Sequence, residues 1–330
     1  MTGSETGGAL AEWPLFGFSD DARPLLSNAR RSATPVALAT IIGLSGGGPR
    51  PVGTQMAFAG EDVSGFLSGG CLESDVAGHA AEVLADGHSR RLTYGEGSPW
   101  ADIRLMCGAR MDILLERIAP DDGAVETLLS LTEARRAAVW VSDGERRACG
   151  PQDDAPASWP GAFQRPFRPA PRLVVLGADP TALAIAALGA EAGWETTLVR
   201  PNGPAKPPPL AGVAYSREDA AEAMAAVGLD PWTAVAAATH DAELDHAALI
   251  AALPSSAFYV GALGARRRRG ERETALLAAG VAPEDIARLR TPIGLELGGK
   301  APWEVAVAAL AEIIQAWNAG ESVDQAMQDS

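Results

Sequence analysis

The chain has 330 residues, 47 % of them hydrophobic, and a formal net charge of −15. This length suits two domains with ample core material. The acidic balance argues against a nucleic-acid partner, whose phosphates the surface would repel, and no apolar run reaches the roughly twenty residues of a membrane span. Three cysteines and a start without a signal-peptide pattern predict a reducing, cytoplasmic location.

The first half of the chain predicts a small α/β domain. The first part, residues 1–20, is expected to be a flexible N-terminus. A domain is expected over residues 21–149, with helices at 22–31, 71–85 and 123–135 and strands at 36–44, 55–59, 63–67 and 111–118. Asp143-Gly144 predicts a hairpin within residues 138–146.

The second half alternates short strands with helices. Residues 150–172 hold six prolines without periodicity and are expected to be a linker. The domain expected over residues 173–330 has strands at 173–177, 196–200, 234–239 and 258–262, and helices at 181–192, 217–227, 244–253, 270–279, 283–289 and 302–316. This alternation predicts βαβ units and a Rossmann-like parallel sheet.

Two glycine-rich turns are the most informative feature of the sequence. The first, residues 45–54, holds Arg50 between two prolines, a stiff setting for an anion-binding side chain. The second, Gly69-Gly70-Cys71, brings a thiol to the predicted start of a helix, where unpaired N–H groups favour the thiolate. Such a turn could hold an anion, a metal or a transferable sulfur; a tight turn around a small buried residue is the alternative.

Two further residues in this half are candidates for the same chemistry. Glu73 follows the thiol closely, although a first-turn carboxylate also simply favours the helix dipole. Cys107 precedes a glycine on a separate loop. If Cys71 and Cys107 face each other, they could bind a metal, exchange sulfur or form a transient disulfide, whereas two small core residues are the alternative.

The turn after the first strand of the second half departs from a dinucleotide fingerprint. Asp179 stands where the second glycine of that fingerprint belongs, and its carboxylate would repel a pyrophosphate. Arg200 stands where an acidic residue would bind the ribose. We therefore do not expect NAD(P) to bind.

Polar residues follow later strands of the predicted parallel sheet. His240 and Asp241 come at the end of one strand, where His240 could contact a phosphate or transfer a proton and Asp241 could cap the next helix. Gly264 ends a glycine turn that leads into Arg266 and Arg267, side chains suited to bidentate phosphate contacts. A structural histidine and a solvated arginine face are the alternatives.

The two glycine-rich turns also carry a family resemblance. Residues 46–56 and 68–75 resemble the signature of the XdhC/CoxI family, the accessory factors of xanthine dehydrogenase and related molybdenum hydroxylases. Further matches follow in order at 106–108, 239–241, 259–267 and 292–295. The resemblance implies an N-terminal XdhC/CoxI-like domain joined to a Rossmann-like domain.

The resemblance also implies a function. Such a protein is a chaperone that binds molybdenum cofactor (molybdopterin, in some cases as a cytosine dinucleotide) and assists its sulfuration and insertion. Its partners are a molybdenum hydroxylase apoenzyme and a cysteine desulfurase, and a homodimer is expected. The implied cofactor-binding residues are Arg50, Gly69, Gly70, Cys71, Glu73, Cys107, His240, Asp241, Gly264, Arg266 and Arg267, with Cys71 as the molybdenum ligand.

Two enzyme classes remain as alternatives. One is an NAD(P)-dependent oxidoreductase, suggested by the βαβ pattern; the other is a thiol-based sulfur-transfer enzyme that uses Cys71. No complete catalytic apparatus is recognisable in the sequence, which favours a non-enzymatic maturation factor.

Overall fold

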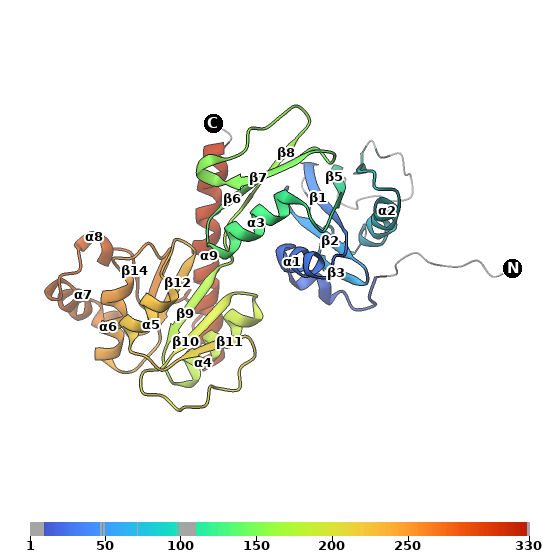
Figure 1. Ribbon diagram of the computed structural model, residues 1–330. Helices are drawn as coiled ribbons and strands as arrows, with labels where there is room; N and C mark the ends of the chain where they lie inside the picture. Colours follow the sequence, from blue (N-terminus) through green and yellow to red (C-terminus); the bar gives the residue numbers. More distant parts are fainter. Residues whose placement is uncertain are drawn as a thin grey trace. The chain divides into compact units, whose positions relative to one another are not determined.

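The computed structural model describes residues 10–46, 48, 50–70, 72–96, 98 and 110–328. The chain divides into two compact units, Met1–Pro169 and Ala170–Ser330, each with its own sheet and core (Figure 1). Within the described ranges, no helix is long and apolar enough to cross a membrane.

The first unit contains a five-stranded antiparallel sheet with strand order β3-β2-β1-β5-β4. Its strands are β1 (Val36–Ser45), β2 (Gln55–Ala59), β3 (Asp62–Gly65), β4 (Arg90–Gly95) and β5 (Arg110–Ile118). Its helices are η1 (Leu15–Phe18), α1 (Arg23–Arg31), α2 (Glu73–Asp86) and α3 (Gly123–Glu133). The expected strands and helices are therefore present, and β4 is an edge strand that the sequence analysis did not anticipate.

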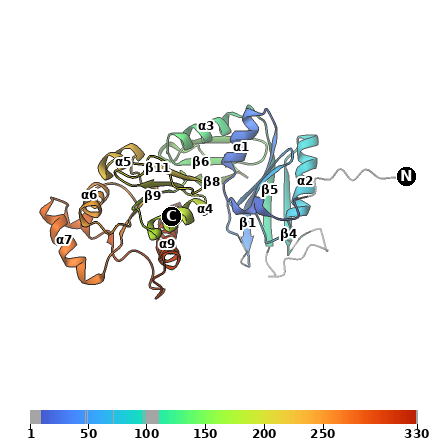
Figure 2. The same ribbon diagram turned by 90° about the horizontal axis from the view of Figure 1, so that it is seen from below.

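Both faces of this sheet are covered, which explains the continuous apolar run of β1. Ala37, Ala39 and Ile41 pack toward α2, while Val36 and Leu38 pack toward α1 and α3. Figure 2 shows α2 on one face of the sheet and α1 and α3 on the other. A strand buried on both faces loses the alternation of apolar and polar residues.

The proline-rich segment 150–172 differs from the expected linker. It contributes to a three-stranded sheet with order β7-β6-β8, formed by β6 (Ala138–Ser142), β7 (Arg147–Pro151) and β8 (Phe163–Phe167), with η2 (Gln152–Asp154) between the last two. The predicted β6–β7 hairpin is present. Pro166 is tolerated in β8 because this strand lies at an edge, where a missing N–H breaks no second ladder.

The second unit is a six-stranded parallel sheet with order β11-β10-β9-β12-β13-β14. Its strands are β9 (Arg172–Leu176), β10 (Glu195–Val199), β11 (Val213–Ser216), β12 (Thr233–Ala237), β13 (Tyr259–Ala262) and β14 (Leu289–Arg290). Its helices are α4 (Pro180–Glu191), α5 (Ala220–Val227), α6 (Ala242–Ala252), η3 (Arg266–Arg268), α7 (Arg269–Ala278), α8 (Pro283–Ile286) and α9 (Pro302–Gln328). The parallel sheet confirms the prediction, and its strand order is that of the doubly wound Rossmann fold.

Helices cover the parallel sheet on both faces. Leu173 and Val175 of β9 pack with α4 and α9, whereas Val174 and Leu176 pack with the helices α5 and α6. The chain order reverses between β9 and β12, so the carboxyl ends of these two strands form the switch point of the sheet.

Candidate functional site

The motif loops of the first unit leave its sheet at a single end. β1 ends at Ser45, β2 begins at Gln55 and β3 ends at Gly65. Gly65 pairs with Met56 next to Gln55, and Gln55 pairs with Thr40 in the last part of β1. Gly95 at the end of β4 pairs with Arg110 at the start of β5, which in turn pairs with Ser45. The connections 46–54, 66–72 and 96–109 therefore all leave the sheet at this end, which we call the motif edge.

Glu73 organises the second glycine-rich turn. Its side chain is buried, and Oε1 accepts hydrogen bonds from the backbone N–H groups of Leu67 (3.0 Å) and Ser68 (2.7 Å). Oε2 accepts from the Ser68 hydroxyl (2.8 Å) and from the backbone N–H groups of Gly70 (2.9 Å) and Leu72 (3.2 Å). The carboxylate thus satisfies donors that the start of α2 and its preceding turn would otherwise leave unpaired.

This arrangement changes the expected role of Glu73. Burial raises the pKa of the Glu73 carboxyl, but the hydrogen bonds from Ser68 and its neighbours outweigh burial and hold it below its usual value. The carboxylate is therefore ionised and occupied within its own loop. Gly69 and Gly70 have φ angles of 112° and 97°, which L side chains rarely adopt, and both are exposed.

The structure places the start of α2 at Glu73, two residues after the expected start at Cys71. Cys71 and Cys107 lie outside the described residues. Cys149 is described as a free thiol, and burial raises its pKa to about 11, so it is protonated at neutral pH.

Arg50 lies in the first glycine-rich turn at the motif edge. Its Nη2 forms an ion pair with Asp20, and its Nε is buried with no hydrogen-bond partner among the described residues. Asp112 and Tyr94 add polar groups near this edge: Thr93 donates to Asp112 (2.7 Å), and the Tyr94 hydroxyl donates to Asp75 (2.6 Å).

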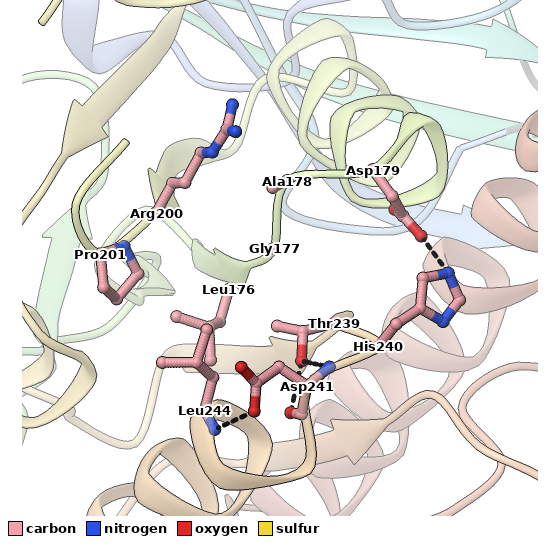
Figure 3. Close-up of a pocket in the computed structure, with 10 residues that line it drawn as sticks. All are labelled: Leu176, Gly177, Ala178, Asp179, Arg200, Pro201, Thr239, His240, Asp241 and Leu244. Atoms are coloured by element: carbon pink, nitrogen blue, oxygen red, sulfur yellow. Dashed lines mark hydrogen bonds and ion pairs between the residues drawn. The ribbon is translucent and has the colours of Figure 1, made fainter. Parts of the chain in front are cut away.

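A second group of predicted residues meets at the switch point of the parallel sheet. A pocket of about 310 Å³ is lined by Leu176, Gly177, Ala178, Asp179, Arg200, Pro201, Thr239, His240, Asp241 and Leu244 (Figure 3). Gly177 is required there, because a Cβ would lie 2.4 Å from the carbonyl oxygen of Ala238. In Figure 3, Arg200 lies on the side of the Gly177 turn away from His240.

Asp179 is the N-cap of α4, at the position where a Rossmann domain that binds a dinucleotide holds the phosphates. Its Oδ1 accepts a hydrogen bond from the backbone N–H of Ala182 at 2.8 Å and caps α4. Its Oδ2 lies 2.9 Å from Nε2 of His240, whose side chain is 86 % exposed (Figure 3). The residue that breaks the glycine fingerprint is thus a helix cap and the partner of a predicted site residue.

A neighbouring pocket of about 490 Å³ shares Thr239 and His240 and includes Gly264 and Arg268. Beneath it lies a buried ion pair between Asp245 and Arg272, with Oδ2 and Nη2 3.0 Å apart. Thr239 donates to Asp245 (2.9 Å), while Arg272 donates to the Leu263 carbonyl (3.0 Å) and the Thr291 hydroxyl (2.9 Å). Burial raises the pKa of the Asp245 carboxyl to about 6. Sequence reasoning missed this pair, because its members lie 27 residues apart on α6 and α7.

The remaining predicted residues have separate positions. Asp241 caps α6 through the backbone N–H groups of Glu243 and Leu244. Arg266 forms an exposed ion pair with Glu296, and Arg267 is exposed; neither lines the two pockets described above. Among the described side chains, no group of three or more His, Cys, Asp or Glu residues is placed to hold a metal ion.

Comparison with known protein families accounts for both units. Residues 29–95 match the model of the XdhC and CoxI family, and residues 173–313 match that of the XdhC Rossmann domain. Together these ranges cover more than half of the chain. The chain belongs to the XdhC and CoxI family.

Relatives of the chain extend over most of its length. It is 29 % identical over 300 residues to the molybdenum cofactor insertion chaperone PaoD of Escherichia coli (strain K12), covering 89 % of this chain and 88 % of PaoD. It is 24 % identical to a probable xanthine dehydrogenase subunit of Bacillus subtilis (strain 168), covering 84 % and 92 % of the two chains. A crystal structure described as a xanthine dehydrogenase from Bacillus halodurans shares the fold, with a TM-score of 0.72, 23 % identity and coverage of 91 % and 96 %.

Proposed function

We propose that this protein binds molybdenum cofactor as cargo and delivers it to the apoenzyme of a molybdenum hydroxylase. The observation that carries the proposal is the match to PaoD along nearly the whole of both chains. Delivery of a bound cofactor needs a binding surface and a partner surface but no catalytic residues, so a non-enzymatic role is favoured.

The motif edge supports the proposal chemically. The Glu73 carboxylate braces the turn that contains Cys71, and the two exposed glycines leave room for a ligand to approach the backbone. A thiolate is a soft ligand suited to a molybdenum–sulfur centre. We assign Cys71 as the residue that contacts the metal or its sulfur, and Cys107, from the connection between β4 and β5, as its partner at the same edge.

Finer features of the function follow from the same assignment. We also propose that the protein assists sulfuration of the cofactor, with a cysteine desulfurase as the partner that supplies the sulfur. We further propose a cytoplasmic homodimer that accepts molybdopterin or its cytosine dinucleotide. His240 and Asp241 at the switch point, and Gly264, Arg266 and Arg267 at the later glycine turn, are proposed as further cofactor-binding residues in the second unit.

Retention of the cofactor tests the proposal. The full chain is mixed with molybdenum cofactor and desalted, and bound molybdenum and pterin are measured separately. The wild type should retain both, and C71S should retain much less because the ligand sulfur is gone. C149S should match the wild type because that thiol is half-buried and protonated. A wild type that retains neither component contradicts the function; C71S with full retention removes Cys71 from the site.

The oxidoreductase alternative has its own test. The carboxylate of Asp179 at the start of α4 opposes a pyrophosphate, so we expect weak binding of NAD and NADP in a calorimetric titration. A dissociation constant in the low micromolar range, about −8 kcal/mol, would instead favour a dehydrogenase.

A further inference from the structure

Arg165 of β8 reaches the motif edge from the far end of the first unit's sequence. Its Nη1 donates a hydrogen bond to the side-chain oxygen of Gln55, the first residue of β2. Its guanidinium lies over the ring of Phe167, with the central carbon 3.9 Å from the ring centroid. Gln55 is itself buried and held by a 3.1 Å hydrogen bond to Thr40, so Arg165 is anchored to the sheet.

The charge of Arg165 lies beside two aspartates that are already paired with other arginines. Asp21 is engaged by Arg23, with Nη2 and Oδ2 2.8 Å apart, and Asp20 is engaged by Arg50. Among the described residues, no carboxylate lies within ion-pair distance of Arg165, although Asp20 and Asp21 are near enough to act on it through space. Three arginines therefore share two aspartates in a protein whose net charge is −15.

Burial makes this imbalance costly. Arg165 is half-buried, and removal of its guanidinium from water lowers its pKa to about 10 although Asp21 and Asp20 act to raise it. Buried arginines are normally paired, because an uncompensated charge in a protein interior is strongly unfavourable. A second unsatisfied donor lies in the same turn region: Nε of Arg50 is buried without a partner in the part of the chain that the structure describes.

The first glycine-rich turn lies directly against Arg165. A Cβ on Gly53 would lie 3.9 Å from both Cγ and Nε of Arg165. Gly53 has a φ angle of 90°, a backbone conformation that favours glycine. Arg50 and Gly53 therefore belong to one turn, and this turn lies next to Arg165 at Gly53.

We propose that Arg165 and Arg50 form a binding site for a phosphate group at the motif edge. A phosphate supplies the missing negative charge, and it matches the planar fork of a guanidinium with two parallel hydrogen bonds. Arg165 provides a fixed guanidinium, and Arg50 exchanges its contact with the exposed Asp20 for the ligand. That this phosphate belongs to molybdenum cofactor rests on the proposed function; the site itself does not.

Calorimetric titration of the full chain with inorganic phosphate, at constant ionic strength set with chloride, tests the site. The wild type should bind phosphate, and R165Q should bind it about tenfold or more weakly, because a hydrogen-bonded charge pair is lost. R136Q is the matched control, since Arg136 is an exposed arginine of the same unit that pairs with Asp153. Its affinity should stay at the wild-type value. A wild type that binds no phosphate, or equal affinity in R165Q, overturns the proposal.

A second variant keeps the proposal testable if R165Q fails to fold. Asp20 competes with the ligand for Arg50 and its side chain is 62 % exposed, so D20N should fold and bind phosphate several-fold more tightly. Unchanged affinity in D20N contradicts the assigned role of Arg50.

Two further measurements, beside the titration with inorganic phosphate, separate the possible sources of the phosphate. The full chain is titrated with cytidine monophosphate, and cofactor retention is measured for R165Q. Loss of phosphate binding in R165Q while the wild type retains no cofactor supports the site and contradicts the proposed function. Cofactor retained equally by wild type and R165Q, with phosphate affinity unchanged, supports the function and overturns the site.

Discussion

Replacing Glu73 with glutamine should collapse the second glycine-rich turn. The change keeps the shape of the side chain but converts one carboxylate oxygen into an NH₂ group, which cannot accept a hydrogen bond. Oε1 accepts from two backbone N–H groups, and Oε2 from two others and the Ser68 hydroxyl. Replacement of Oε1 leaves the backbone N–H groups of Leu67 and Ser68 without an acceptor. Replacement of Oε2 does so for Gly70 alone, because the N–H of Leu72 also donates to the Ser68 hydroxyl at 3.1 Å. At about 1–3 kcal/mol for each unsatisfied donor, E73Q should destabilise the first unit by about 1–6 kcal/mol.

Urea denaturation followed by circular dichroism measures this loss, with each unit's transition fitted separately because two units need not unfold together. E61Q is the matched control, since Glu61 is an exposed carboxylate on the short β2–β3 turn of the same unit. It should stay within about 0.5 kcal/mol of the wild type. The rate at which a thiol reagent modifies Cys71 in folded protein should also change in E73Q alone.

The same carboxylate predicts an acid dependence. Because the folded-state pKa of Glu73 is below its ordinary value of 4.5, its stabilisation is present above that value and is lost as the pH falls through the lower folded value. E73Q should lack this part of the acid transition. If E73Q matches the wild type in both stability and acid dependence, the carboxylate does not brace the turn.

Two further predictions concern the second unit. Burial raises the pKa of Asp245 from 3.8 to about 6, so its contribution to stability is fully present below 3.8 and lost as the pH rises through about 6. D245N should therefore remove up to about 3 kcal/mol of pH dependence between about pH 4 and about pH 7 in thermal denaturation, and an unchanged pH profile would contradict this. D179G should lower the stability of the unit by only about a few tenths of a kcal/mol, because glycine is itself tolerated at a helix N-cap, yet raise its affinity for NADH in calorimetry. H240A keeps the carboxylate and serves as the control; if D179G leaves NADH affinity at the H240A value, Asp179 is not the barrier to binding.

The sequence by itself determined the local structure and the family. The alternation of short apolar strands with helices in residues 173–316 requires a parallel sheet, because each strand must be followed by a crossover. The pair Gly69-Gly70 predicts a turn, because glycine adopts positive φ angles that other residues avoid. Both φ angles are positive in the structure. The position of Asp179 in the fingerprint was enough to predict that a pyrophosphate binds weakly there, which the titration above tests.

Only the tertiary structure shows which polar groups form hydrogen bonds with one another and which strands pair. From its place at the start of a helix, Glu73 is predicted to interact with the helix dipole. Only the folded turn shows that its carboxylate accepts hydrogen bonds from the backbone of Leu67, Ser68, Gly70 and Leu72. The prolines of segment 150–172 predict a linker, because proline is disfavoured in strands. The segment nevertheless contains β8, which pairs with β6 at the edge of its sheet. That pairing carries Arg165 to Gln55, 110 residues away in sequence. Pairings of this kind depend on long-range packing, which local propensity and spacing do not encode.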